Sequence, residues 1–359
     1  MNGQLARIAD REEDYARLGL KPGQIAAWED GMRTSGERGS YEWWYFDAHL
    51  DDGSSMVITF YTKPMLSPKG PEAPLITVDL DRPGQPKKHL MLHATAEQFS
   101  ASRERCDVRI KDSYFRGDLH TYQIKVVDEG ISIDVELVGQ VSAWRPGTGH
   151  VYFGEHDDHL FAWLPSVPQG KVTATITEKG SSRTLTGIGS NHDHNWGDVA
   201  MAKLLNHWYW GRAQAGPYSI VASYLYAEKA YGQAELPIFM LAKNGKVVAD
   251  VSSKVTLLLE DEHTDPNSGK PVADRVIYDY KDDQNRYRVT FHRSETILDL
   301  RFADMVTGFK HILARMANVD GAYLRFTGTV SVERYVGDEI VEQASDPGIW
   351  ELMYFGHVE

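Results

Sequence analysis

Apolar and polar residues alternate along many short runs of this chain with a period of two. In residues 218–227, for example, Tyr224 and Tyr226 fall on one side of the run, while Val221 and Leu225 fall on the other. A period of two is typical of a β-strand, whose successive side chains point to opposite faces of the sheet. Such runs recur along most of the chain, and no helical pattern of about 10–15 residues alternates with them. The fold class is therefore predicted as all-β, with antiparallel barrels or sandwiches and few helices.

Short turn signals separate these runs and indicate hairpins. Asp51-Asp52-Gly53 follows the first aromatic-rich run, and Lys179-Gly180 divides a threonine-rich one. Asn244-Gly245 is the typical sequence of a two-residue type I′ turn, because both residue types accept a positive φ. Neighbouring runs are thus predicted to pair as antiparallel strands.

The length of 359 residues is long for one domain and suits two. Residues 1–38 are polar and are interpreted as a leader segment, which includes a short helix within residues 10–20. The strand series is divided into an N-terminal β domain, residues 39–188, and a C-terminal β domain, residues 189–359. Phe309–Met316 is an apolar stretch that is predicted to form a helix or a long loop.

A dense group of histidine, aspartate and tryptophan residues occupies residues 191–198. In an extended conformation His194 and Trp196 share one face, and Asp193 faces the opposite way. An imidazole beside an indole in a dry pocket can move a proton to or from an apolar molecule, since low polarity strengthens electrostatic effects. His194 is therefore the candidate catalytic acid or base, with Asp193 or Asp198 as the group that orients it.

A second aromatic run follows a few residues later. Trp208, Trp210 and Arg212 share one of its faces and are candidate substrate-binding residues. Tyr224 and Tyr226 of the next run can present their hydroxyl groups to a common pocket, as hydrogen-bond or proton donors. Aromatic residues at period two also make an ordinary barrel core. A binding pocket without chemistry and a purely structural core therefore stand as alternative interpretations of both runs.

The first strand of the series, residues 40–50, carries an acid among indole rings. Glu42 and Trp44 share one face of this strand, and Trp43 lies on the other. Both tryptophans are candidate substrate-binding residues. In a dry pocket the pKa of Glu42 would rise, as a general acid requires, so that Glu42 is a candidate catalytic residue. The alternative is that Glu42 pairs with an arginine or caps backbone amides.

Composition excludes several classes of partner. A net charge of −13 argues against nucleic acids and anionic membrane surfaces, both of which need a basic footprint. Cys106 is the single cysteine, so an internal disulfide is impossible and a reducing, cytoplasmic location is expected. Residues 1–7 lack the apolar core of a signal peptide. The sequence contains no run of about 18 apolar residues, the length that a membrane-spanning helix needs. Composition says nothing about the oligomeric state.

A metalloenzyme is the weakest of the chemical hypotheses. His192 and His194 form a His-x-His pair that could face a metal ion, and His207 could join them. The spacing does not fix this third ligand, and a cysteine-rich site is excluded by the single cysteine. No metal is therefore expected, and the predicted partner is a hydrophobic small molecule.

Four motifs resemble those of a known group. They are Glu42-Trp43-Trp44-Tyr45-Phe46-Asp47, His194-Asn195-Trp196-Gly197, the aromatic pair in His207-Trp208-Tyr209-Trp210, and the closing Trp350-Glu351. Together they resemble the AttH-like and carotenoid 1,2-hydratase (hydroxyneurosporene synthase, CrtC-like) group. The same superfamily includes the lipocalin-like Diels-Alderases of fungal decalin biosynthesis. The resemblance covers the chain from about residue 38 to its end.

This resemblance implies two consecutive lipocalin-like (calycin) β domains with an apolar pocket in or between them, and no obligatory organic cofactor or metal. For the hydratases it implies protonation of an alkene by an Asp in a Tyr-x-Asp motif downstream of a His-x-Trp element. His194 and Trp196 match the first element. Tyr224-Leu225-Tyr226 has a tyrosine where the Asp is expected. Since tyrosine has a pKa of about 10, alkene hydration is in doubt.

Three functions are compatible with these observations. The first is a cofactor-free hydratase, isomerase or cyclase of secondary metabolism that acts on a terpenoid or polyketide-like molecule through acid-base residues in an aromatic pocket. The second is a Diels-Alderase-like pericyclase that folds a polyene and needs no proton donor. The third is a lipocalin-type carrier of an apolar ligand.

Overall fold

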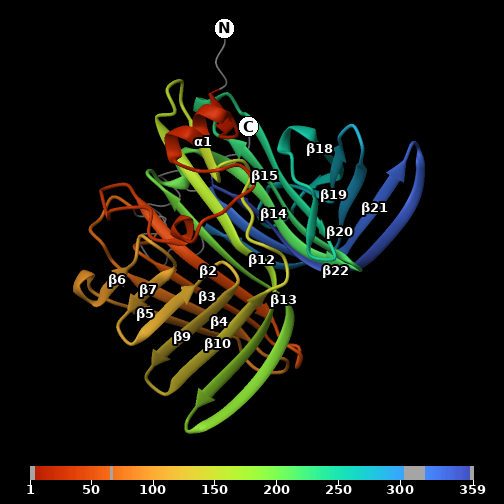
Figure 1. Ribbon diagram of the computed structural model, residues 1–359. Coiled ribbons are helices and arrows are strands. Elements are labelled where there is room, and N and C mark those ends of the chain that lie inside the picture. The colour runs from red at the N-terminus through yellow and green to blue at the C-terminus, as the bar shows by residue number, and fades with distance from the viewer. Residues whose placement is uncertain (1–4, 65–67, 303–319, 356–359) are drawn as a thin grey trace. The chain divides into compact units, whose positions relative to one another are not determined.

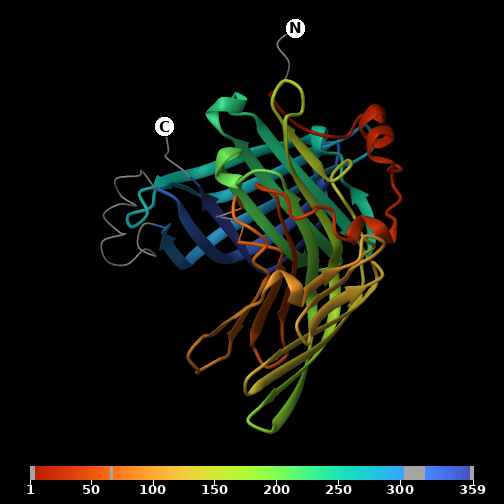
Figure 2. The ribbon, with the colours of Figure 1, turned by 90° about the vertical axis from the view of Figure 1, so that its left-hand side faces the viewer.

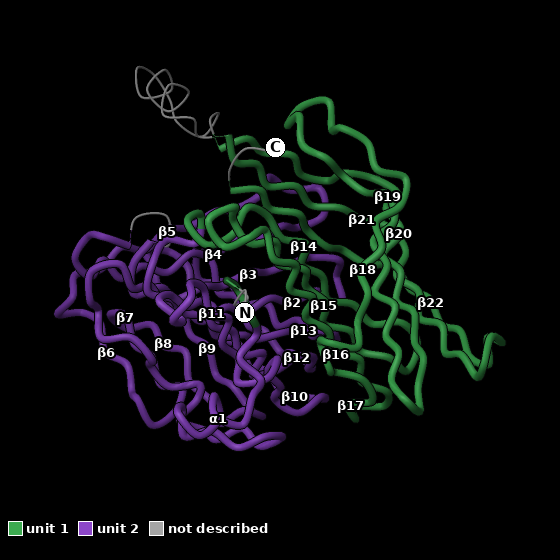
Figure 3. The backbone as a smooth tube through the Cα atoms, turned by 90° about the horizontal axis from the view of Figure 1, so that it is seen from above, with its two compact units in different colours: residues 1–7, 202–359 green, residues 8–201 purple. Residues whose placement is uncertain are grey.

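The computed structural model describes residues 5–64, 68–302 and 320–355. The chain forms two compact units, which Figure 3 draws in different colours. Unit 1 comprises residues 1–7 and 202–359, and unit 2 comprises residues 8–201. The stretch predicted as a helix or long loop, Phe309–Met316, lies outside the described residues.

Unit 2 is built on a 13-stranded sheet, with one α-helix and two 3-10 helices among its described residues. These elements are β1 (Ala6–Ile8), α1 (Glu12–Leu18), η1 (Ala27–Asp30), β2 (Tyr41–His49), β3 (Ser55–Tyr61), β4 (Leu75–Asp81), β5 (Lys88–His93), η2 (Ala96–Gln98), β6 (Phe99–Ala101), β7 (Asp107–Ile110), β8 (Ser113–Gly117), β9 (Thr121–Asp128), β10 (Ile131–Gly139), β11 (His150–Phe153), β12 (His159–Glu178) and β13 (Ser181–Gly197). The strand order is β5-β4-β3-β2-β13-β12-β10-β9-β8-β7-β6, with β11 beside β12 and β1. Neighbouring strands along this path are antiparallel.

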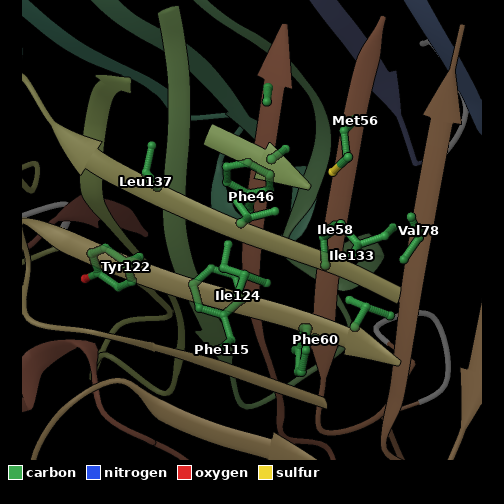
Figure 4. Close-up of a cluster of buried hydrophobic side chains, with 14 of the residues drawn as sticks. Phe46, Met56, Ile58, Phe60, Val78, Phe115, Tyr122, Ile124, Ile133 and Leu137 are labelled. Atoms are coloured by element: carbon green, nitrogen blue, oxygen red, sulfur yellow. The ribbon is translucent and has the colours of Figure 1, made fainter. Parts of the chain in front are cut away.

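The sheet of unit 2 wraps around its own core. Phe60 of β3 and Phe115 of β8 are distant in the strand order, yet their rings meet edge to face at 5.8 Å. Figure 4 shows side chains from β2–β4 and from β8–β10 pointing toward one another in this buried cluster. An open, flat sheet could not bring these strands into contact, so the apolar faces of its two halves enclose a common interior.

Unit 1 carries a nine-stranded sheet of the same kind. Its elements are η3 (Met201–Lys203), β14 (Leu205–Ala215), β15 (Tyr218–Ala227), η4 (Lys229–Tyr231), β16 (Glu235–Lys243), β17 (Lys246–Ala249), η5 (Ser252–Lys254), β18 (Val255–Thr264), β19 (Pro271–Lys281), β20 (Arg286–Arg301), β21 (Ala322–Val336) and β22 (Glu339–Tyr354). The order is β17-β16-β15-β14-β22-β21-β20-β19-β18. Phe239 of β16 stacks on Tyr278 of β19 at 6.0 Å, although these strands are not neighbours. The all-β fold class predicted from the alternation, with antiparallel strands and few helices, is thus confirmed among the described residues.

The predicted hairpin turns are also confirmed. Lys179-Gly180 joins β12 to β13 with φ values of 50° and 80°, and Asn244-Gly245 joins β16 to β17 with φ values of 50° and 79°. Two successive positive φ angles define the type I′ turn, whose twist matches that of the flanking strands. The first turn ends the long β12–β13 hairpin, which is drawn in green at the bottom of Figures 1 and 2.

From Ile8 onward the leader segment belongs to unit 2. The predicted short helix is α1, which Gly19 ends in the left-handed conformation with a φ of 67°. Farther along, the indole Nε1 of Trp44 donates a hydrogen bond of 3.2 Å to the carbonyl of Asp30. Among the described residues, no helix is long and apolar enough to cross a membrane.

Candidate functional site

The central cluster lies on β13, between β2 and β12. As the period of two predicts, His192 and His194 point to one side, where both approach Asp30. Asp193 points to the other side, where the side-chain amides of Asn191 and Asn195 donate hydrogen bonds to it. Both sides are buried. The strand therefore carries two separate polar clusters, one on each face.

His194 is held between two carboxylates and two indole rings. Its Nε2 lies 2.7 Å from Oε1 of Glu42, and its Nδ1 lies 3.5 Å from Oδ1 of Asp30. The imidazole stacks on Trp44 with ring centroids 4.7 Å apart and packs against Trp196 at 4.8 Å. Its exposed fraction is 0%. The structure therefore brings together four of the predicted site residues, which are His194, Glu42, Trp44 and Trp196.

Glu42 caps backbone amides, as the alternative interpretation of this residue in the sequence predicts. Its Oε1 accepts from the amide of Arg33 at 2.6 Å, and its Oε2 accepts from the amide and hydroxyl of Thr34 at 2.9 and 2.7 Å. With His194 as a further partner, the carboxylate is fully enclosed. Glu42 thus joins the leader segment to β13.

Asp30 is the site residue that sequence reasoning missed. Its Oδ2 accepts a hydrogen bond from the hydroxyl of Tyr122 and lies 3.3 Å from Nε2 of His192. Burial alone would raise the pKa of Asp30, but the charge and hydrogen bond of His192, with help from His194 and Tyr122, hold that pKa below its ordinary value. Asp30 sits in a short 3-10 turn without strand or helix periodicity, so no sequence pattern marks it.

One group of side chains near this cluster could offer ligands to a metal ion. Oxygen, sulfur and nitrogen atoms of Asp30, Cys106 and His192 lie within 4.8 Å of one another. Burial raises the pKa of the Cys106 thiol, which opposes the thiolate form that a metal ion needs. The trio of the metalloenzyme hypothesis is different, since it combines His192 and His194 with His207, which belongs to unit 1.

A pocket of about 320 Å³ lies in unit 2 beside the buried cluster. Its apolar wall consists of Leu18, Leu20, Trp28, Leu160, Leu164 and Trp196. Trp196 keeps 8% of its surface exposed, while His194 behind it keeps none and does not line the pocket. The indole therefore separates the pocket from the imidazole.

The polar part of the pocket wall comes from the leader segment, from the loop before β11 and the first residue of β11, and from the end of β13 with the residue after it. It consists of Glu29, Arg33, Thr34, Glu37, Arg145, Thr148, His150 and Asp198, with the backbone of Gly149 and Gly197. Arg145 donates from Nε to Oε2 of Glu29 at 2.8 Å, and both side chains are buried. This pair fastens the leader to the loop before β11.

His150 is a second functional candidate that sequence reasoning missed. Its Nδ1 lies 3.0 Å from the carbonyl oxygen of Thr148, and its ring meets that of Trp196 edge to face at 5.4 Å. Burial lowers the pKa of His150 to about 4, although its bond to Thr148 favours the proton, and the nearby cations of Arg145 and Arg17 add to the lowering. The only available sequence signal was its alternation with Tyr152, on which it stacks.

Two of the predicted site residues lie on the far face of β13 and β2. Asp193 is enclosed by its amide partners, and burial raises the pKa of its carboxyl. Trp43 pairs with Asn195 across the two strands, and its ring stacks on Tyr41 at 5.5 Å. Neither lines the pocket.

The other five predicted residues belong to unit 1, and none of them lines the pocket of unit 2. They are Trp208, Trp210, Arg212, Tyr224 and Tyr226. Tyr226 stacks on His207 at 4.7 Å, and Trp208 meets Phe355 edge to face at 4.8 Å. Tyr224 lies in the core of unit 1, where burial raises the pKa of its hydroxyl.

Comparison with known protein sequences finds matches over parts of the chain. A family model described as Diels-Alderase-like matches residues 151–321. The chain is 30% identical over 82 residues to the quinolone epoxide rearrangement protein of Penicillium thymicola, which covers 23% of this chain and 22% of that protein. It is 26% identical over 210 residues to the hydroxyneurosporene dehydrogenase of Chlorobaculum tepidum, which covers 48% of this chain and 53% of the relative. Neither match reaches two thirds of the relative's length.

Solved structures with the same fold cover nearly the whole chain. A candidate AttH protein of Nitrosomonas europaea has a TM-score of 0.60 at 14% identity, over 94% of this chain and 99% of that one. CghA in complex with Sch210972 has a TM-score of 0.59 at 12% identity, over 89% and 90%. Kievitone hydratase of Nectria haematococca has a TM-score of 0.52 at 11% identity, over 98% and 97%. The chain is thus similar to the Diels-Alderase-like family over residues 151–321 and has the fold of the AttH and CghA structures, in agreement with the resemblance seen in its motifs.

Proposed function

We propose that this protein is an enzyme that binds a hydrophobic terpenoid or polyketide-like molecule in the pocket of unit 2 and acts as a hydratase, isomerase or cyclase. The observation that carries the proposal is the position of Trp196, which lines the pocket and packs against the buried His194 at 4.8 Å. Relatives named for an epoxide rearrangement and for a hydratase support a small-molecule enzyme. The proposed reaction uses no organic cofactor and no metal ion.

In this proposal His194 and Glu42 are positioning residues. Neither exposes surface to the pocket, so neither touches the substrate. Their hydrogen bond fixes the imidazole against Trp196, and the same carboxylate fixes the backbone of Thr34, which also lines the pocket. A wall held in this way keeps a flexible substrate in one reactive conformation, and such preorganisation lowers a reaction barrier without a covalent step.

Cyclisation or isomerisation fits the pocket better than alkene hydration. Protonation of an alkene needs a strong acid that faces the substrate. The lining carboxylates act as acceptors instead: Glu29 accepts from Arg145, and Asp198 accepts from the amide of Leu160 at 3.1 Å. Glu37 accepts from the amide and hydroxyl of Ser35 at 2.8 and 2.7 Å. Shape, aromatic surface and hydrogen bonds are what this pocket offers.

Mass spectrometry of apolar molecules extracted from the purified protein tests the proposal. We expect a hydrophobic molecule from the wild type, its loss in Trp196→Ala, and its retention in Trp210→Ala, which changes a tryptophan of unit 1. The extracted molecule and its biosynthetic precursors are then incubated with fresh protein. If the protein converts none of them, the result would favour the lipocalin-type carrier. Retention by Trp196→Ala would refute the assigned pocket.

A further inference from the structure

We propose that His150 selects the ligand of this pocket, by accepting a hydrogen bond at Nε2 from a hydroxyl or N–H group of an otherwise apolar molecule. The inference rests on the proposed function and adds the chemical class of the ligand. It assigns to the part of the pocket wall formed by the start of β11 a polar contact that none of the sequence motifs contains.

Two aromatic rings fix the position of the imidazole of His150. His150 is the first residue of β11, and it stacks on Tyr152 at 5.9 Å and meets Trp196 edge to face at 5.4 Å. The residue keeps 8% of its surface exposed and lines the pocket together with Trp196. A ligand that lies on the indole of Trp196 is therefore next to the imidazole.

The hydrogen bond at Nδ1 determines which nitrogen faces the ligand as an acceptor. The carbonyl oxygen of Thr148, 3.0 Å from Nδ1, can only accept, so Nδ1 carries the hydrogen. No residue in the described part of the chain bonds Nε2, and this atom is not sealed from solvent. Burial and the cations of Arg145 and Arg17 keep the ring neutral at pH 7 against the weaker pull of Asp14. Nε2 therefore presents a lone pair.

The other buried polar groups of the wall are already engaged within the protein. Arg145 donates to Glu29 and to the carbonyl oxygens of Gly147, Lys21 and Gln24. The hydroxyl of Thr34 donates to Glu42. These groups hold the wall together and have little capacity left for a ligand, which makes His150 the buried acceptor that a ligand can reach.

An acceptor in this environment discriminates between ligands. A ligand that fills the pocket without a donor displaces water from Nε2 and leaves the nitrogen unpaired, whereas a ligand with a hydroxyl replaces the lost bond. Sites that bond a hydroxyl reject the analogue that lacks it. The low basicity of the ring makes it a hydrogen-bond acceptor in this role, and no proton is transferred.

The test compares 1-naphthol with 1-methoxynaphthalene, which share a ring system and differ in the donor. Dissociation constants are measured by calorimetry at pH 7 for the full-length wild type, His150→Phe and His150→Gln. We expect the preference for 1-naphthol to be about tenfold greater in the wild type than in His150→Phe. His150→Gln places an amide oxygen near the position of Nε2, and we expect it to keep most of the preference.

The outcomes separate this inference from the proposed function. Equal preference in the wild type and in His150→Phe, with both compounds bound, overturns the role of His150 and leaves the pocket as the binding site. Failure of the wild type to bind either compound overturns the pocket and this inference together. His150→Leu provides a second variant without an acceptor if thermal unfolding shows that His150→Phe does not fold.

Discussion

Trp196 packs against the imidazole of His194 with ring centroids 4.8 Å apart, and it also lines the pocket of unit 2. The indole is therefore the physical link between the buried ionisable cluster and the surface that a ligand touches. A change on one side of this ring reaches the other side through the packing of Trp196.

Replacement of His194 by alanine is expected to destabilise unit 2 by about 3–5 kcal/mol, because it breaks buried contacts to two enclosed carboxylates. Glu42 and Asp30 would lose the imidazole that lies between them. Urea-induced unfolding measures the loss. His89→Ala is the matched control, since His89 pairs with Asp79 at 2.7 Å but both side chains are more than half exposed, and its cost should stay below about 1 kcal/mol. Similar losses for both variants would contradict the buried network.

Trp196→Ala is expected to weaken the binding of 1-naphthol by about tenfold or more, because a buried aromatic wall contributes both area and shape to a small-molecule site. Trp210→Ala removes an indole from unit 1 and should leave the dissociation constant unchanged. Calorimetric titration of both variants checks this prediction. A larger effect from Trp210 than from Trp196 would move the ligand site away from the pocket of unit 2.

Thr34→Val is expected to lower the free energy of unfolding by about 1 kcal/mol, because the hydroxyl bond to Glu42 is lost while side-chain volume is kept. The two amide bonds to this carboxylate remain. Thr175→Val provides the comparison: its hydroxyl bonds that of Thr184 on an exposed surface, and we expect a smaller change. Chemical denaturation measures the free energy of unfolding of both variants. Equal changes in the two would contradict the role of the buried bond between Thr34 and Glu42.

The stability of unit 2 is expected to fall as the pH decreases from about 6.5 to 4. His150 has a folded-state pKa of about 4, below its ordinary value of 6.5, so the unfolded chain binds more protons in this range. The loss from this one residue approaches about 3 kcal/mol at the acid end. The lowered pKa of Asp30 acts in the same direction at lower pH. His150→Phe should flatten the pH dependence of the unfolding free energy, and an unchanged slope would refute the assignment.

Local pattern predicted the strands and turns because both depend on neighbouring residues. The period of two placed His194 and Trp196 on one face of β13 and Asp193 on the other, and positive-φ residues marked the turns at Lys179-Gly180 and Asn244-Gly245. These features follow from backbone geometry alone.

The composition of the site could not be predicted in the same way. Asp30 and His192 are 162 residues apart in sequence, and only the wrapped sheet and the inserted leader bring them together. His150 lies in a short strand whose role depends on the carbonyl oxygen of Thr148 and on Trp196. The pairing of Glu42 with His194 joins residues 152 positions apart, and the backbone caps of Glu42 depend on Arg33 and Thr34, which lie outside any motif.

The leader has a practical consequence for anyone who produces this protein. A recombinant chain begun at residue 39 would keep every strand from β2 onward and yet lack Trp28, Arg33 and Thr34 from the ligand-facing wall. It would also lack Asp30, so that Tyr122, His192 and His194 would lose a buried hydrogen-bonding or ion-pair partner. A chain truncated where the recognisable motifs begin would thus have an incomplete ligand pocket and would not be a minimal domain.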